Sequence, residues 1–165
     1  MKKFLIAATA LMLYVSASSA FGGASIQHIP IVNEGNAAAK LVRNKNALSV
    51  TGTVYDLQPG ETYTVWWIVL DGGVLVLNAT GGIANGAGEL HFAASVQAGT
   101  YDGTNDRRQV LVPGTLTNPS AAHVIFDVIS HGPRIPGRVR EQTSTFEGGC
   151  DVFACDLAAS FEFAP

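Results

Sequence analysis

The sequence is poor in cysteine and in charged residues. It has two cysteines in 165 residues, and Asp, Glu, Lys and Arg make up 14% of the chain, against the usual quarter. Two cysteines cannot build the disulfide-rich framework that replaces a core in small secreted domains. A hydrophobic fraction of 47% excludes an intrinsically disordered chain. We therefore expect a protein that folds around an ordinary apolar core.

Positive charge is scarce as well. The formal net charge is -3 and the pI is about 5.7. A nucleic-acid-binding domain needs a basic face and a high pI, and the same electrostatics govern binding to an anionic membrane surface. We expect neither as a partner, and the composition identifies no other partner.

The sequence also lacks an apolar run of the roughly 20 residues that a membrane-spanning helix needs. The apolar residues 4–15 follow two lysines and precede the small residues 16–20. This order is typical of a secretory signal peptide. We predict that residues 1–20 are a signal peptide cleaved after Ala20; the alternative is a retained membrane anchor.

Cleavage would leave residues 21–165 as the mature protein. Losing Lys2 and Lys3 leaves 8 basic against 13 acidic residues, so the net charge moves from -3 to -5. No cysteine follows the cleavage site for lipid attachment, and the C-terminal SFEFAP is no apolar anchor. We expect a secreted or periplasmic protein with one domain over residues 21–165 and no membrane insertion.

Short segments of alternating apolar and polar residues predict strands. In ALSVTGTVYDL (47–57), Leu48, Val50 and Val54 fall on one side of an extended chain. In YTVWWIVL (63–70) both sides are apolar from Val65 onward, which favours a central strand. Further strands are expected at 74–79, 89–97, 110–112, 121–130 and 157–163, with loops at 80–88, 100–109 and 115–120. Seven or eight strands without a helix predict an all-β antiparallel sandwich, immunoglobulin-like with long loops.

The pattern Leu57-x-Pro59-Gly60-x-x-Tyr63 resembles the tyrosine corner of immunoglobulin-like and fibronectin type III domains. In that corner a tyrosine at the start of a strand bonds its hydroxyl to backbone upstream. We expect a buried carbonyl as the partner here. The resemblance implies a fold class and no activity.

Histidine and aspartate suggest one metal hypothesis. His123, Asp127 and His131 share one face of the strand AHVIFDVISH. Positions four apart in a strand are roughly 13 Å apart, whereas zinc holds its nitrogen ligands at about 2 Å. A site would need His91 or His28 from another strand, so we assign no metal site and no cofactor.

Catalytic signatures are absent from the sequence. It has no G-x-S-x-G motif, and Ser144, between two threonines, is expected to be a turn or strand hydroxyl. We therefore assign no catalytic residue. In an exported chain, Cys150 and Cys155 are expected to form a disulfide; the alternatives are two free thiols or a pair of soft-metal ligands.

The densest run of ionisable residues is SHGPRIPGRVREQTSTFEGGCDVFACD, residues 130–156. His131, Arg134, Arg138 and Arg140 are our candidate binding residues, because guanidinium groups bind carboxylates and phosphates through paired hydrogen bonds. Arg107 and Arg108 are possible helpers. Four acidic residues share the run: Glu141, Glu147, Asp151 and Asp156. Internal salt bridges are therefore the simpler interpretation.

The adjacent pair Trp66 and Trp67 suggests a carbohydrate platform. Neighbouring residues of a strand point to opposite faces. At most one of these rings can then be exposed, and we expect at least one in the core.

Two blocks carry a family resemblance: LVRNKNALSVTGTVYDLQPGETYTVWW (41–67) and SHGPRIPGRVREQTSTFEGGC (130–150). Together they resemble a group of exported bacterial proteins of uncharacterised function. In that group a longer, often cysteine-bearing loop follows the Trp-Trp strand, whereas residues 71–82 here are a short tract without cysteine. The resemblance implies export and a β fold, and it brings no activity to any residue.

Taken together, these features favour a non-catalytic extracellular or periplasmic binding or structural module. The alternative is a hydrolase or metal-dependent enzyme with a site near His131, Arg134 and Glu141, where polar residues follow a strong strand. The sequence alone identifies neither a ligand nor a substrate.

Overall fold

The computed structural model describes residues 24–29, 36–104, 108–148, 150 and 155–165. The predicted signal peptide, residues 1–20, lies outside the described residues. Within them the chain forms strands and one helical turn, α1 (Val139–Gln142). The strands are β1 (Ser25–Ile29), β2 (Ala37–Asn44), β3 (Ala47–Val54), β4 (Glu61–Leu70), β5 (Val74–Ile83), β6 (Leu90–Gln97), β7 (Gly99–Tyr101), β8 (Val110–Val112), β9 (Gly114–Leu116), β10 (His123–Pro133) and β11 (Asp156–Phe163). Across the described part of the chain, no helix is long and apolar enough to cross a membrane.

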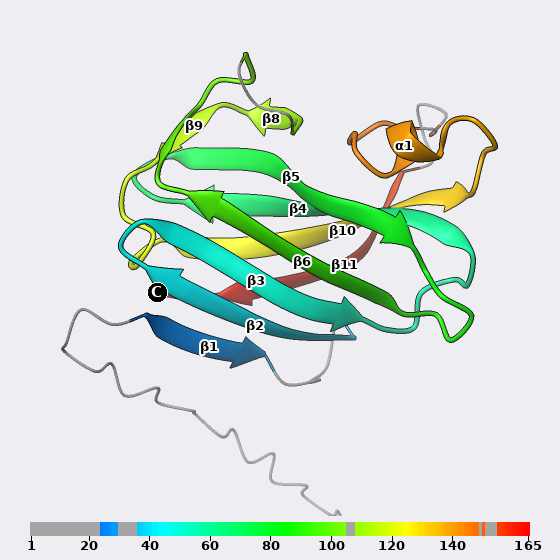
Figure 1. The fold of residues 1–165 in the computed structure, drawn as a ribbon, viewed down its shortest axis with the longest axis horizontal. Coiled ribbons are helices and arrows are strands. Elements are labelled where there is room, and N and C mark those ends of the chain that lie inside the picture. Colours follow the sequence, from blue (N-terminus) through cyan, green and yellow to red (C-terminus); the bar gives the residue numbers. More distant parts are fainter. Residues whose placement is uncertain (1–23, 30–35, 105–107, 149, 151–154) are drawn as a thin grey trace, which may run out of the picture.

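Two antiparallel sheets form the sandwich (Figure 1). We call them sheet A, with strand order β1-β2-β3-β6, and sheet B, with order β11-β10-β4-β5-β8. β7 and β9 pair as a separate two-stranded sheet. The predicted all-β antiparallel sandwich is confirmed, and β4, the predicted central strand, lies in the middle of sheet B.

The core lies between sheets A and B, on the faces that the alternation predicts. Leu48, Val50 and Val54 of β3 are at most 1% exposed. From sheet B, Trp67 packs against Phe126 with ring centroids 4.5 Å apart. A period of two in the sequence therefore places the inward residues of these strands correctly.

The tyrosine corner is present at the start of β4. Residues Gln58 to Glu61 form a turn closed by a Glu61 N–H to Gln58 carbonyl bond of 3.2 Å, with Gly60 at φ 82°. The Tyr63 hydroxyl accepts a hydrogen bond from the backbone N–H of Gln58 at 3.0 Å and donates to the Glu61 carboxylate at 3.2 Å. The upstream backbone partner of the hydroxyl is thus the amide N–H of Gln58, and the prediction of a carbonyl partner is wrong.

Several strands lie where the sequence pattern predicts none. β1 and β2 are not among the predicted strands. The inward side chains of β2 are two small alanines, a leucine and an arginine (Ala37, Ala39, Leu41 and Arg43), which give a weak apolar signal. β7 and β9 occupy predicted polar loops. β5 continues to Ile83, through the glycines that were predicted to turn the chain. Those glycines have a packing role, described below.

Buried Arg43, at the end of β2, ties sheet A to the edge of sheet B. Its guanidinium is 2% exposed and donates to the carbonyl of Phe163 at 2.9 Å and to that of Ala122. It also donates to the Gln27 side chain at 2.8 Å. Burial lowers the pKa of Arg43 from its ordinary value. The sequence block 41–67 therefore contains a structural arginine.

Candidate functional site

After β10, the chain up to Gly148 folds back over the outer face of sheet B. We call residues 134–148, which include α1, the covering segment (Figure 1). It lies against β5 at Gly81, where a β-carbon would collide with the backbone of Thr143. The covering segment can approach β5 this closely only because residue 81 is a glycine. The glycine at this position therefore serves a close contact within a strand and not a turn.

The covering segment buries Trp66, which points away from the core. Trp66 is 1% exposed, and the ring of Phe146 packs on it edge-on with centroids 5.2 Å apart. Trp67 is fully buried on the other face of β4. Neither tryptophan is exposed, so this pair forms no carbohydrate platform.

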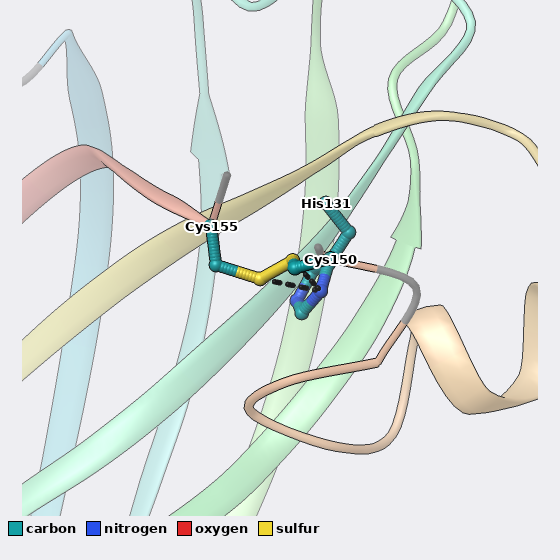
Figure 2. Close-up of side chains that lie close together, drawn as sticks. All are labelled: His131, Cys150 and Cys155. Atoms are coloured by element: carbon teal, nitrogen blue, oxygen red, sulfur yellow. Dashed lines mark hydrogen bonds between the residues drawn. A yellow bond between two sulfur atoms is a disulfide. The ribbon is translucent and has the colours of Figure 1, made fainter. Parts of the chain in front are cut away.

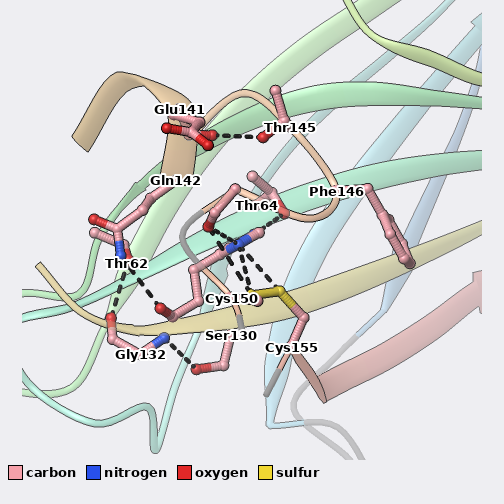
Figure 3. Close-up of a disulfide and its surroundings, with 12 residues drawn as sticks. Thr62, Thr64, Ser130, Gly132, Glu141, Gln142, Thr145, Phe146, Cys150 and Cys155 are labelled. Atoms are coloured by element: carbon pink, nitrogen blue, oxygen red, sulfur yellow. Dashed lines mark hydrogen bonds between the residues drawn. A yellow bond between two sulfur atoms is a disulfide. The ribbon is translucent and has the colours of Figure 1, made fainter. Parts of the chain in front are cut away.

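Gln142 fixes the path of the chain as it leaves β10 (Figure 3). Its side chain is fully buried; its amide nitrogen donates to the carbonyls of His131 at 3.2 Å and Pro133 at 3.1 Å. Its amide oxygen accepts the backbone N–H of Ile135 at 2.9 Å. One side chain thus satisfies three backbone groups of the loop, which makes the loop rigid.

The next turn is built by Pro136 and Gly137. The backbone N–H of Arg138 donates to the Ile135 carbonyl at 3.0 Å, and Gly137 has φ 81°. A type II turn favours proline at its second position and needs a positive φ, usually from glycine, at its third. α1 begins directly after it, at Val139.

His131 is the buried ionisable residue of the site. The ring, 4% exposed, bonds through Nε2 to the Thr64 hydroxyl at 2.7 Å and through Nδ1 to the Gly148 carbonyl at 2.8 Å. The indole N–H of Trp66 donates to the same hydroxyl at 2.8 Å.

These partners determine where the protons lie. A carbonyl can only accept, so Nδ1 of His131 carries a proton toward Gly148. The indole N–H can only donate, so the Thr64 oxygen accepts from Trp66 and its own proton is available to Nε2. Burial lowers the pKa of His131 from its ordinary 6.5, and the bond to Gly148 opposes this shift with a smaller effect. The ring is therefore neutral near pH 7.

The predicted disulfide between Cys150 and Cys155 is present, with Cα atoms 5.5 Å apart. It lies against the His131 ring (Figure 2), whose Nδ1 is 3.5 Å from the sulfur of Cys150 and 3.4 Å from that of Cys155. The three atoms are a possible metal-ligand group, all within 4.8 Å of one another. Both cysteines are half-buried.

The three candidate arginines lie on the outside of the covering segment. Arg138 forms a two-bond ion pair with Glu141, at 2.9 and 2.8 Å, and this hydrogen bonding lowers the pKa of Glu141. Arg134 and Arg140 are exposed. Their guanidinium groups make no hydrogen bond or ion pair with any residue that the structure describes.

Of the two proposed helpers, Arg108 lies among the described residues. Arg108 donates to the Ser95 carbonyl at 2.8 Å, while Arg107 and the acidic Asp151 fall outside the described residues. The Ser144 hydroxyl donates to the Arg140 carbonyl at 2.6 Å. It is a turn hydroxyl, as the sequence predicts.

The residues of the enzyme hypothesis are not joined by hydrogen bonds. No hydrogen bond joins His131 to Arg134 or to Glu141: both ring nitrogens of His131 are bonded elsewhere, and Glu141 is paired with Arg138. The geometry gives that alternative no support.

The other histidines are dispersed. His123 contacts Glu162 at 3.2 Å and Asp127 accepts from Ser160 at 2.7 Å, both across β10 and β11. His91 bonds to Thr53 at 2.8 Å on sheet A, and His28 is exposed on β1. In a regular strand His123, Asp127 and His131 are too far apart to bind one metal ion. Their different hydrogen-bond partners are consistent with that spacing.

Comparison with known proteins assigns nothing further to these residues. No protein-family model, curated protein or solved structure matches the chain.

Proposed function

We propose that the protein is exported and works outside the cytoplasm as a non-catalytic β-sandwich that binds anionic ligands through Arg134 and Arg140. The ligand class is a carboxylated, phosphorylated or sulfated molecule. Membership of the exported group that shares the two sequence blocks is part of this proposal. The N-terminal sequence pattern supports export, and a disulfide fits an oxidising compartment.

The observation that carries the proposal is the contrast between a fixed backbone and two unpaired guanidinium groups. Gln142 holds the backbone of residues 131–135 through three hydrogen bonds. Arg134 lies within this held stretch and Arg140 lies in α1 with Gln142; both are exposed, without a partner among the described residues. A binding group on a rigid loop loses less conformational entropy when a ligand binds.

Arg138 provides an internal comparison. Its guanidinium already meets a carboxylate through two parallel hydrogen bonds with Glu141. This is the geometry that an external carboxylate or phosphate would adopt with a free guanidinium. The pair neutralises its own charge, so Arg134 and Arg140 are the cations available to a ligand.

Binding can be tested by isothermal titration and by NMR shift mapping on the oxidised protein. The probes are inorganic phosphate, a uronic-acid oligosaccharide and a sulfated oligosaccharide. We expect at least one probe to bind, and the double substitution Arg134→Ala, Arg140→Ala to weaken it at least tenfold.

Lys45→Ala is the control, since it removes an exposed cation from the turn between β2 and β3, outside the covering segment, and it should leave affinity within about twofold at fixed salt. If the control and the double variant lost affinity equally, the weaker binding would reflect the change in net charge and not these two arginines. Binding of no probe, or binding unaffected by the double substitution, would refute the proposal.

A further inference from the structure

The imidazole of His131 and the two cysteine sulfurs bring together three donor atoms that soft metal ions prefer. Nδ1 of His131 lies 3.5 Å from the Cys150 sulfur and 3.4 Å from the Cys155 sulfur (Figure 2). His131 is buried, whereas Cys150 and Cys155 are half-buried residues.

The nitrogen–sulfur distances are those of a tetrahedral metal site. With a metal–sulfur distance of about 2.3 Å and a metal–nitrogen distance of about 2.05 Å, ligands at the tetrahedral angle are separated by about 3.6 Å. The sulfurs of such a site are about 3.8 Å apart. The imidazole nitrogen is thus already at a suitable distance from both sulfurs. To admit a metal, the bonded sulfurs must separate and the Gly148 carbonyl must leave Nδ1.

We propose that reduction of the disulfide converts Cys150, Cys155 and His131 Nδ1 into a binding site for one soft d10 cation, Zn²⁺ or Cu⁺. Zn²⁺ takes an external fourth ligand such as water, and Cu⁺ is bound by the three protein atoms alone. The metal and the disulfide exclude each other, so the site is gated by redox state. The inference is independent of anion binding at Arg134 and Arg140.

The chemistry balances with an external dithiol as reductant. The S–S bond breaks, two electrons and two protons pass to the cysteines, and the dithiol closes to its own disulfide. When the metal binds, both thiols release their protons to solvent.

His131 adapts by moving one proton within the ring. Nδ1 must lose its proton to bind a metal, and Nε2 takes up a proton in its place. The Thr64 hydroxyl proton then turns away from the ring, and Nε2–H donates to the Thr64 oxygen, 2.7 Å away, which keeps the ring in its present orientation. The Gly148 carbonyl gives up its bond to the ring.

The test uses the full protein reduced under anaerobic conditions with a phosphine. Zn²⁺ and Cu⁺ are titrated separately against chromogenic chelators. We expect one metal ion per reduced chain and none per oxidised chain. Cys150→Ser and Cys155→Ser should each lower affinity at least a hundredfold.

His131→Ala should lower affinity at least tenfold, while His91→Ala and His123→Ala should not change it, because those histidines lie elsewhere. Since His131→Ala removes buried hydrogen bonds, X-ray absorption of the unmutated, metal-loaded protein provides a second measurement that does not depend on its folding. We expect two sulfur ligands near about 2.3 Å and one imidazole nitrogen near about 2.0 Å.

Two results would overturn the inference. One is the absence of stoichiometric metal in the reduced, folded protein. The other is a bound metal whose first shell contains no imidazole nitrogen. Neither result bears on anion binding, which is measured on the oxidised protein.

Discussion

Gly81 of β5 and Thr143 of the covering segment meet backbone to backbone, at a point where any β-carbon on residue 81 would collide with the Thr143 carbonyl. The same contact places Phe146, three residues further along the chain, over Trp66. A residue without a side chain on sheet B thus helps to position the loop that carries the candidate arginines.

Gly81→Ala should therefore displace the covering segment. We expect a loss of about 1–3 kcal/mol in the free energy of unfolding, as for overpacked sites, together with increased accessibility of Trp66 to a fluorescence quencher. Gly73→Ala is the control, because its β-carbon would meet nothing within 4 Å. Equal stability of the two variants in urea would contradict the contact.

Gln142→Ala should release the loop between β10 and α1. It leaves the carbonyls of His131 and Pro133 and the amide of Ile135 without their present partner. Each buried polar group left unsatisfied costs about 1–3 kcal/mol, with partial recovery from water. We expect faster hydrogen exchange at the Ile135 amide, measured by NMR.

The exposed Gln97, whose side chain makes no hydrogen bond with a described residue, provides the matched variant Gln97→Ala. Its exchange rates at Ile135 should equal those of the parent protein. Unchanged protection of Ile135 in Gln142→Ala would show that the side chain does not hold the loop.

The sandwich could be predicted from the sequence because its inner faces are encoded locally. Leu48, Val50 and Val54 alternate with polar residues, and the period of two gives both the strand and its buried side. β2 is not predicted because its alanines bury too little apolar surface to indicate which side of the strand faces the core. Gly81 was misread because a glycine required for close approach has the same sequence signal as a glycine required for a turn.

The site could be predicted only in part, because its contacts join distant segments. The bridge between Cys150 and Cys155 is local, and the expectation of export together with the cysteine spacing predicts it. The contact of His131 with Thr64 spans 67 residues and depends on the pairing of β4 with β10. The hydrophobic pattern of a sequence does not indicate that a buried glutamine hydrogen-bonds to backbone groups. The role of Gln142 is therefore visible only in the structure.

Asp71 should make stability depend on pH in the acid range. Its carboxylate accepts the backbone N–H of Asn118 at 2.7 Å and the Thr117 hydroxyl at 2.8 Å. These bonds, that to Asn118 first, hold the pKa of Asp71 below its ordinary 3.8. A lowered folded-state pKa gives stability above the unfolded value, and this stability is lost as pH falls through the folded value.

We therefore expect Asp71→Asn to cost about 0.5–1 kcal/mol near pH 7, a modest amount because Asp71 is partly exposed to solvent. The difference from the parent protein should shrink as pH falls below about 4 in urea titrations. Glu147→Gln is the control, since that carboxylate makes no hydrogen bond with a described residue. A difference that stays constant with pH would exclude the ionised carboxylate as its source.

Loss of the disulfide should lower the thermal stability of the protein without displacing the covering segment from sheet B. The Cys150–Cys155 bridge closes a short loop, and the entropy of such a loop corresponds to about 2 kcal/mol. The double substitution Cys150→Ser, Cys155→Ser should then lower Tm by about 4–8 °C. Because the bonds of Gln142 to the chain leaving β10 do not involve sulfur, exchange at Ile135 should change less than in Gln142→Ala. Loss of protection at Ile135 equal to that in Gln142→Ala would mean that the bridge, rather than the glutamine, holds the loop in place.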